Sequence, residues 1–415
     1  MSLKKMLLLF AVASQGSLFA QKIPNDTISI QTLDPLVVTA NKFPQKQSTT
    51  GKVITVIDKK TINQNAGKTV AQLLNEVAGI TVNGALNNAG TNQTLFLRGA
   101  SSGRTLILMD GIPVFDASQI NNEFDLNQLS LNNVESIEVC KGPQSTLYGS
   151  DAVAGVVNII TVPQNVTKPL QGSFTNSFGS YGTLKSALQL YGKQGKWQYN
   201  TRISGMKTNG FSAAHDSVGN KNFDADAYKG TNAMASITYQ ANKNWQWRNF
   251  VHTNYYRSDA DAAAFADKKN FYVKHRNTLL GTSIQNQTTK YKWQVNYQYN
   301  YQTRFFNDNA DVVGATSFST NSFQSKSHFA EAFGNIRLAK QWEVLVGVDY
   351  RHNTMRNNYS SMSVWGPFKS QFNDTSIQQL SAYSSLLFKS GKWHVELGGR
   401  WNNHSKYGNN STFTF

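Results

Sequence analysis

The sequence predicts a compact α+β domain followed by an antiparallel transmembrane β-barrel. Helix and strand signals are mixed up to about Pro163, whereas short strands of alternating polarity, separated by Asn, Gly and Lys turns, dominate beyond it. A tryptophan also recurs at nearly even intervals through the second region. No stretch after the N-terminus approaches the roughly 18 consecutive apolar residues of a membrane-spanning helix, so helices are not expected to cross the membrane.

The start of the chain is predicted to be a secretory signal peptide, residues 1–20. Lys4 and Lys5 form a positive beginning, Met6–Val12 form a short apolar run, and Ala20 is a plausible cleavage point. The mean hydropathy of the chain is −0.42. That value agrees with an exported barrel, because half of the residues in each barrel strand face a polar interior.

The tryptophan repeat carries the barrel prediction. The spacings are 48, 48, 49 and 51 residues, and each tryptophan follows a short polar turn and opens an alternating run, at Trp197, Trp245, Trp293, Trp342 and Trp393. Two strands of about ten to fourteen residues, one tight turn and one loop of about 15–25 residues would fill such a period. The tryptophans would then form one aromatic girdle at the membrane interface.

A β-sandwich and a β-propeller are the alternatives for this region. A propeller blade needs three tight turns per repeat, whereas each repeat here has one tight turn and one long loop, so the barrel is preferred. Counting gives about eleven strands, the last near Trp393–Asn402, although Thr412–Phe415 imitates a terminal strand. Because an odd, open barrel leaves unpaired backbone groups in lipid, we expect the chain to be a truncated sequence.

Charge and cysteine use exclude other classes. The formal net charge is +16, but the basic residues are scattered and the chain is exported, so lipopolysaccharide phosphates are preferred over nucleic acid as the counter-charge. The single cysteine, Cys140, cannot form an intrachain disulfide. Its neighbours Glu138 and Lys141 supply no histidine, so we do not interpret it as a catalytic thiol.

The region before the barrel is predicted to be a domain of about 115 residues. Thr69–Val77 has the pattern of a short amphipathic helix. Thr94–Gly99, Leu106–Gly111 and Val134–Val139 have the pattern of strands, and Asp110-Gly111 indicates a tight turn. Earlier, the β-prone run Asp34–Ala40 lies in polar, proline-bearing sequence, which suits a flexible arm that adds a strand to a partner's sheet edge.

These motifs resemble a known family. Gly142–Thr161 closely resembles the end of the plug domain of TonB-dependent receptors. Leu97-Arg98-Gly99, Asp110-Gly111 and Val134–Val139 fit that plug in order and spacing. Leu36–Ala40 resembles the TonB box of the family, where Pro35 departs from the commoner residue.

The resemblance implies an organisation and a set of partners. The expected parts are a signal peptide (1–20), a periplasmic arm with the TonB box (21–48), a plug domain (49–163) and a partial β-barrel (164–415), about half of the family's roughly twenty-two strands. TonB, acting with ExbB and ExbD, is the implied partner of the box residues Asp34, Pro35, Leu36, Val37, Val38, Thr39 and Ala40.

Within the family the chain is most similar to the cobalamin receptors. Asp34–Asn41, Tyr148–Thr161 and Gly398–Phe413 carry this similarity. Two long loops also concentrate six aspartates, Asp216, Asp224, Asp226, Asp259, Asp261 and Asp267. Hard oxygen ligands from two loops can hold Ca²⁺. The resemblance singles out Asp224, Asp226, Asp261 and Asp267 as calcium ligands, against the alternative that these are ordinary solvated acidic loops.

The ligand is expected at the outer face, between barrel loops and the plug apices Leu86–Asn92 and Phe115–Asn122. Their polar side chains can hydrogen-bond the amide groups of a corrinoid, and the candidates are Asn87, Asn88, Asn92, Asp116, Ser118 and Asn121. No covalent cofactor is expected, and a surface lipoprotein is left open as a further partner. A haem or ferric-siderophore receptor would share every feature except the ligand.

A barrel enzyme and a passive porin are the alternatives from other functional classes. A barrel enzyme needs a catalytic constellation, but the seven histidines are dispersed and neither an H-E-x-x-H nor a G-x-S-x-G pattern occurs. A passive porin does not carry a domain of about 115 residues inside its lumen. The sequence therefore predicts a receptor for active transport rather than an enzyme or a pore.

Overall fold

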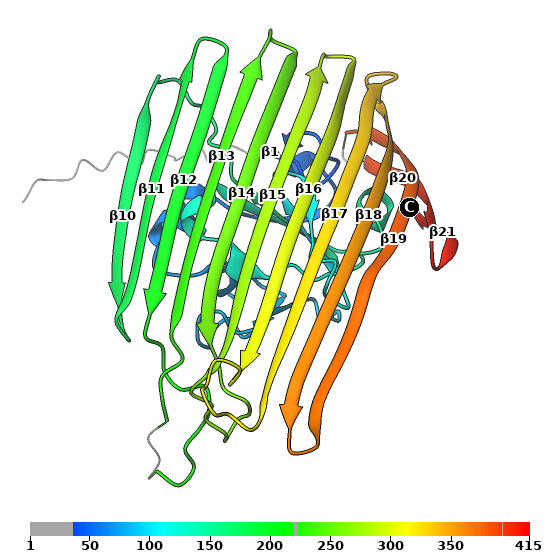
Figure 1. Cartoon of the computed structure of the whole chain (residues 1–415). Coiled ribbons are helices and arrows are strands. Elements are labelled where there is room, and N and C mark those ends of the chain that lie inside the picture. The colour runs from blue at the N-terminus through cyan, green and yellow to red at the C-terminus, as the bar shows by residue number, and fades with distance from the viewer. Residues whose placement is uncertain (1–35, 220–222, 392) are drawn as a thin grey trace, which may run out of the picture. The chain divides into compact units, whose positions relative to one another are not determined.

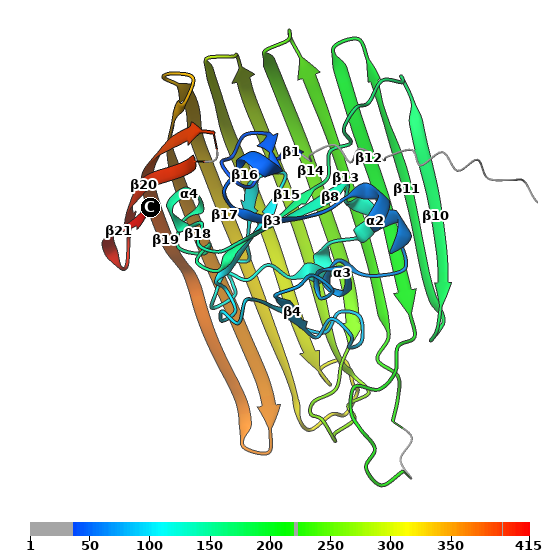
Figure 2. The same cartoon turned by 180° about the vertical axis from the view of Figure 1, so that it is seen from behind.

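The computed structural model describes residues 36–219, 223–391 and 393–415, so the predicted signal peptide, Asp34 and Pro35 lie outside the described residues. In the described part of the chain, no helix has the length and apolar character needed to cross a bilayer. The elements fall into a long antiparallel sheet and a smaller α+β domain, which lies against one face of that sheet (Figures 1 and 2).

The long sheet has twelve strands, each paired with its neighbours in chain order. They are β10 (Gln171–Gly179), β11 (Thr183–Gln194), β12 (Trp197–Thr208), β13 (Tyr228–Gln240), β14 (Trp245–Asp259), β15 (Phe271–Gln287), β16 (Tyr291–Asp308), β17 (Phe318–Arg337), β18 (Trp342–Ser363), β19 (Gly366–Ser390), β20 (Trp393–His404) and β21 (Gly408–Thr414). The expected antiparallel barrel strands are confirmed. The strand that sequence counting missed is β21.

The tryptophans mark strand starts as predicted. Four of the five are the first residue of their strand, and Trp293 is the third residue of β16. The predicted strand lengths were too short for β15–β19, which have 17, 18, 20, 22 and 25 residues. The extra length is taken from the loops, since only residues 364–365 separate β18 from β19. We call the end of the sheet with the tryptophans the tight-turn end and the other the long-loop end (top and bottom of Figure 1).

The α+β domain is built on a five-stranded mixed sheet in the order β3-β8-β9-β6-β7. These strands are β3 (Val53–Ile57), β6 (Thr105–Met109), β7 (Ile112–Val114), β8 (Ser136–Lys141) and β9 (Gly155–Ile160). A separate hairpin joins β4 (Ile80–Asn83) to β5 (Thr94–Leu97), and β1 (Leu36–Val37) pairs with β2 (Gln45–Lys46). The short helices are η1 (Gln47–Thr49), α2 (Lys59–Gln64), α3 (Val70–Leu74), η2 (Leu126–Gln128), η3 (Leu131–Asn133) and α4 (Ser145–Tyr148).

The predicted turn at Asp110-Gly111 is confirmed. Both residues have positive φ, 50° and 82°, and they join β6 to β7 with Met109 opposite Ile112. Two neighbouring residues with positive φ match the twist of a tight hairpin, which aspartate and glycine tolerate. Asp110 does more than turn the chain, because its carboxylate accepts hydrogen bonds from the Thr161 amide and hydroxyl, both at 2.7 Å.

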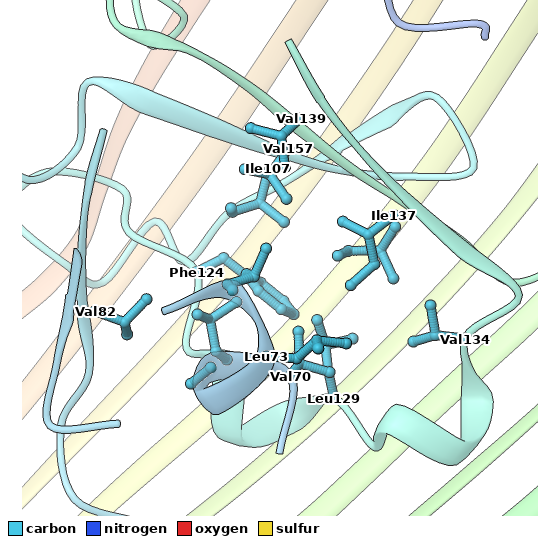
Figure 3. Packing of buried hydrophobic residues seen from close by; sticks show 14 of the residues in the cluster. Val70, Leu73, Val82, Ile107, Phe124, Leu129, Val134, Ile137, Val139 and Val157 are labelled. Atoms are coloured by element: carbon cyan, nitrogen blue, oxygen red, sulfur yellow. The ribbon is translucent and has the colours of Figure 1, made fainter. Parts of the chain in front are cut away.

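The core of the domain lies between α3 and the five-stranded sheet (Figure 3). A reciprocal capping box between Thr69 and Gln72 starts α3, and the buried Val70 and Leu73 of this helix belong to the same core cluster as Val139 and Val157 of the sheet. The predicted helix Thr69–Val77 was too long. It ends at Asn75, whose side chain leaves the helix pattern to accept a hydrogen bond from the Val82 amide at 2.8 Å.

Candidate functional site

The run predicted to pair with a partner, here called the box segment (Leu36–Ala40), is stored inside the molecule. Val37, Thr39 and Ala40 are buried, and Leu36 is exposed. Leu36 and Val37 already form a short strand opposite Lys46 and Gln45. The predicted flexible arm is therefore wrong for residues 36–48, because the segment has internal partners for its backbone.

A buried carboxylate holds the box segment. Glu138, on β8, is 2% exposed. It accepts hydrogen bonds from the amides of Val38 at 3.0 Å and Thr39 at 2.9 Å, and from the Thr39 hydroxyl. The Tyr148 hydroxyl donates to the carbonyl of Thr39 at 3.1 Å. Hydrogen bonds to an ionised acceptor are stronger than neutral ones, so Glu138 acts as a clamp on the segment.

The residues that follow fix the segment to the barrel. Lys42 forms a buried ion pair with Glu331 on β17, and its ammonium lies 4.5 Å from the centre of the Tyr148 ring. Phe43 packs against Phe333 with ring centroids 5.2 Å apart. These contacts lie at the tight-turn end, as Figure 2 shows for β1. The site therefore couples box segment, plug and barrel through one set of charged and aromatic contacts.

Further along, four barrel arginines point inward and pair with plug carboxylates. Arg304 lies 3.1 Å from Asp116 and Arg351 lies 2.8 Å from Asp151. The other two pairs are Arg202 with Glu135 and Arg248 with Asp110. These arginines come from β12, β14, β16 and β18, one from every second strand. Sequence reasoning missed them, because their spacings of 46, 56 and 47 residues are less even than those of the tryptophans.

Two of the predicted ligand residues have structural partners instead. Asn88 is buried, and its side chain bonds both the carbonyl and the amide of Phe211. Asp116 is 1% exposed and accepts hydrogen bonds from Ser118, Arg304 and Ser325. The expectation that these side chains lie open to a ligand is corrected, because their oxygens are already engaged. They instead position the two plug loops against the barrel.

The remaining predicted ligand residues lie on the same two loops. Asn87, Asn92 and Asn121 are exposed, whereas Ser118 is half-buried and donates to Asp116. A cavity of about 310 Å³ opens beside the first loop, between the plug and β10–β12. Its lining includes Asn87, Lys185 and Phe211. This volume is at the small end of ligand sites and has room for part of a large ligand.

The aspartate loops converge in part. Ligand oxygens of Asp224, Asp261 and Asp267 all lie within 4.8 Å of one another. The Asp226 carboxylate is next to this group but accepts from the Ala213 amide at 2.6 Å. Burial raises the pKa of Asp224 to about 6, with the neighbouring Asp267 carboxylate adding to the shift, and burial raises that of Asp226 to about 6. The two loops therefore place several negatively charged carboxylates close to one another.

The other two loop aspartates lie apart from this group. Asp216 caps a turn by accepting from the amides of Val218 and Gly219, and Asp259 ends β14 in an ion pair with Arg257. Cys140 is fully buried, and burial raises the pKa of its thiol to about 11, which agrees with a structural role.

An antiparallel transmembrane sheet that carries an α+β domain against its inner face defines a plugged outer-membrane barrel. Residues 46–156 match the family profile of the TonB-dependent Receptor Plug Domain. Residues 46–156 are therefore a plug domain of the TonB-dependent receptor type, and the chain as a whole is similar to outer-membrane receptors of that family.

The chain is also similar to individual proteins in sequence and in fold. The chain is 25% identical over 387 residues to the vitamin B12 transporter BtuB of Vibrio cholerae, covering 92% of this chain and 59% of that protein. Its fold matches the P. aeruginosa receptor FpvA with a TM-score of 0.71 at 14% identity, covering 91% of this chain and 54% of that one. It matches the ferric yersiniabactin uptake receptor FyuA of Yersinia pestis with a TM-score of 0.68 at 16% identity, covering 89% and 61%. The chain thus spans 59% of the length of the transporter that it resembles in sequence.

Proposed function

We propose that the chain is the gating part of a transporter that binds cobalamin or a related corrinoid at the long-loop end and imports it with energy supplied through TonB. The observation that carries the proposal is the stored box segment. Its backbone pairs internally and its amides bond to Glu138, so it is held by contacts that a competing strand can replace. A plug with such a segment needs a partner on the periplasmic side.

TonB is the proposed partner of this segment. Once the segment leaves its place beside β2 and Glu138, its free backbone groups can add as a strand to the sheet edge of TonB. ExbB and ExbD would couple this attachment to the proton gradient, and a pull on the segment would act on the plug through Lys42 and Phe43. The ion pairs between the barrel arginines and the plug resist that pull, so the plug is moved only under load.

The ligand is proposed to rest on the two plug loops at the long-loop end. Asn87, Asn92 and Asn121 are exposed there, and amide side chains can both donate to and accept from the amide groups of a corrinoid periphery. The similarity to the vitamin B12 transporter over most of the chain supports a corrinoid. The solved relatives include siderophore receptors, which supports the fold and makes a ferric siderophore or haem the alternative ligand.

Calcium is proposed as an ordering ion for the outer loops. Carboxylate oxygens that bind one Ca²⁺ lie about 2.3–2.6 Å from it, so opposite ligands are roughly 5 Å apart. The oxygens of Asp224, Asp261 and Asp267 have this spacing, and Asp226 lies beside them. The ion would neutralise the like charges, which would hold loops 209–227 and 260–270 together before the ligand arrives.

The test is a comparison of ligands on the full-length protein in detergent micelles. Binding of cyanocobalamin, haemin and a ferric siderophore is measured by titration under the same conditions, with and without calcium. We expect cyanocobalamin to bind most tightly. Tightest binding of haemin or the siderophore would replace the corrinoid assignment with the alternative while leaving the receptor class intact. No binding of any of the three would contradict the receptor assignment itself.

A further inference from the structure

The outer face of the sheet, turned to the viewer in Figure 1, carries an unusual set of charges. Lys207, Lys229, Arg257 and Lys274, here called the basic row, lie on the adjacent strands β12, β13, β14 and β15. Each faces the next directly in the pairing register. Lys207, Lys229 and Arg257 are exposed, and Lys274 is half-buried. Like charges opposite one another on neighbouring strands are destabilising, so four in a row need an explanation.

The depth of the basic row follows from three aromatic residues and an isoleucine at the other end of the same strands. Trp197, Tyr239, Trp247 and Ile284 also face one another across the four strands, ten residues from the basic row on each strand. Ten residues span about 33 Å along a strand, and a tilt of about 40° reduces this to about 25 Å along the membrane normal. That equals the height of the apolar band of a membrane barrel, so the basic row lies at the level of the outer headgroups.

The surface between the two rows supports this placement. The outward positions of the four strands there are uncharged except Arg276, which adjoins Lys274. They are Tyr199, Thr201, Ile203, Gly205, Ile237, Ala235, Ala233, Thr231, Asn249, Val251, Thr253, Tyr255, Thr282, Leu280 and Thr278. A ligand of the basic row therefore borders, on its membrane side, a surface that is uncharged apart from Arg276 and that includes Ile203, Ile237, Val251 and Leu280.

The chain supplies little counter-charge to the basic row. Arg257 pairs with Asp259 at 3.2 Å. Within the described residues, Lys207 and Lys229 form neither an ion pair nor a side-chain hydrogen bond. The Arg257 guanidinium lies 4.0 Å and the Lys274 ammonium 4.7 Å from the centre of the Tyr272 ring, and the neighbouring Arg276 lies 5.8 Å from the centre of the Tyr255 ring. These rings hold the cationic ends in place without neutralising them.

We propose that the basic row binds the phosphate groups of lipopolysaccharide in the outer leaflet. Several cations in a line match a headgroup with more than one phosphate, and lysine and arginine are the usual phosphate ligands. A lipid rather than free phosphate is the occupant, because the nearly uncharged surface below the row, which faces the membrane, leaves room for acyl chains beside the bound headgroup. The proposal rests on the outer-membrane location and needs neither the corrinoid ligand nor TonB.

The experiment compares two quadruple variants of the full-length protein, purified free of lipid. One replaces the basic row (K207Q, K229Q, R257Q and K274Q), and the control replaces four tight-turn lysines (K196Q, K243Q, K290Q and K340Q). Lipopolysaccharide binding is measured by native mass spectrometry. One basic residue near an anionic surface contributes about fivefold. Because Asp259 already offsets Arg257, three cations remain, and we expect the row variant to bind roughly a hundredfold more weakly than the wild type. The control should bind like the wild type.

Stability without lipid distinguishes lost binding from lost folding. In lipid-free micelles the row variant should melt at or above the wild-type temperature, because like charges have been removed. Lipopolysaccharide should then raise the melting temperature of the wild type and of the control, but not that of the row variant, and inorganic phosphate should not substitute for it. Equal binding by all three proteins, or equal loss in both variants, would overturn the proposal. So would a row variant that is less stable without lipid.

Discussion

The two faces of the barrel sheet differ in how far their basic residues are paired with carboxylates. On the inner face, Arg202, Arg248, Arg304 and Arg351 each have a carboxylate from the plug. On the outer face, the basic row has one carboxylate, Asp259, for four cations. Charges that the fold itself must hold are neutralised within the chain. Charges left unbalanced point to a partner from outside, and we propose a lipid for the basic row and a calcium ion for the clustered aspartates.

The inner pairs should be the costliest to break. Asp116→Ala removes the partner of Arg304 from a nearly dry site, and an unpaired buried charge costs about 3–5 kcal/mol. We expect the free energy of unfolding, measured by chemical denaturation in micelles, to fall by that amount. The control is Glu76→Ala, which breaks the exposed Lys68–Glu76 pair and should cost less than about 1 kcal/mol. Equal losses would show that burial does not set the value of these pairs.

The Glu138 clamp should rank next. Glu138→Gln replaces an acceptor-only carboxylate by an amide whose NH₂ faces the amides of Val38 and Thr39, which should cost about 1–3 kcal/mol. The box segment should then open more often, and a Val37→Cys reporter should react with maleimide roughly tenfold faster. Glu123→Gln is the control, and the buried Cys140 is the internal reference. An unchanged rate at position 37 would mean that Glu138 does not hold the segment.

Calcium should act on the aspartate loops more weakly. At about ten times its dissociation constant, a ligand that binds only the folded state adds roughly 1.4 kcal/mol. We expect calcium to raise the melting temperature of the full-length protein relative to excess chelator, and the Asp224→Asn, Asp261→Asn, Asp267→Asn variant to lose this response. Asp216→Asn, in the same loop but outside the cluster, should keep it. An identical response in both variants would leave the cluster as ordinary acidic surface.

The smallest effect is expected on the outer face. Lys229→Gln should change the free energy of unfolding in lipid-free micelles by less than about 0.5 kcal/mol, and an increase is the expected direction, because the residue has like charges on both sides. Chemical denaturation without lipopolysaccharide measures it. A loss comparable to that of Asp116→Ala would erase the difference between the two faces.

Short sequence patterns predicted those elements whose structure depends mainly on residues that are neighbours in the sequence. The tryptophan period located strand starts because a girdle residue must follow each turn, and Asp110-Gly111 located a hairpin because its backbone conformation needs those residues. The amphipathic pattern of Thr69–Val77 likewise located α3. The lengths of β15–β19 were missed, because strand residues beyond the apolar band look like loop residues in sequence.

The site was less predictable because its contacts join distant segments. Glu138 meets Thr39 across 99 residues and Asp116 meets Arg304 across 188. Periodicity shows that a residue points inward, but not which plug side chain it meets. Asn88 and Asp116 looked like open polar loop residues for this reason, and only the docked plug shows that they serve to position loops.

Energised uptake by a box variant tests the central claim most directly. In Leu36→Pro, the proline lacks the N–H that an added strand needs, whereas Leu36→Ala keeps it. Cells expressing the full-length protein are assayed for binding of labelled cyanocobalamin and for its energy-dependent accumulation. The account predicts that Leu36→Pro binds like the wild type but no longer accumulates the ligand, and that Leu36→Ala retains accumulation. Wild-type accumulation by Leu36→Pro would contradict transport coupled through this segment.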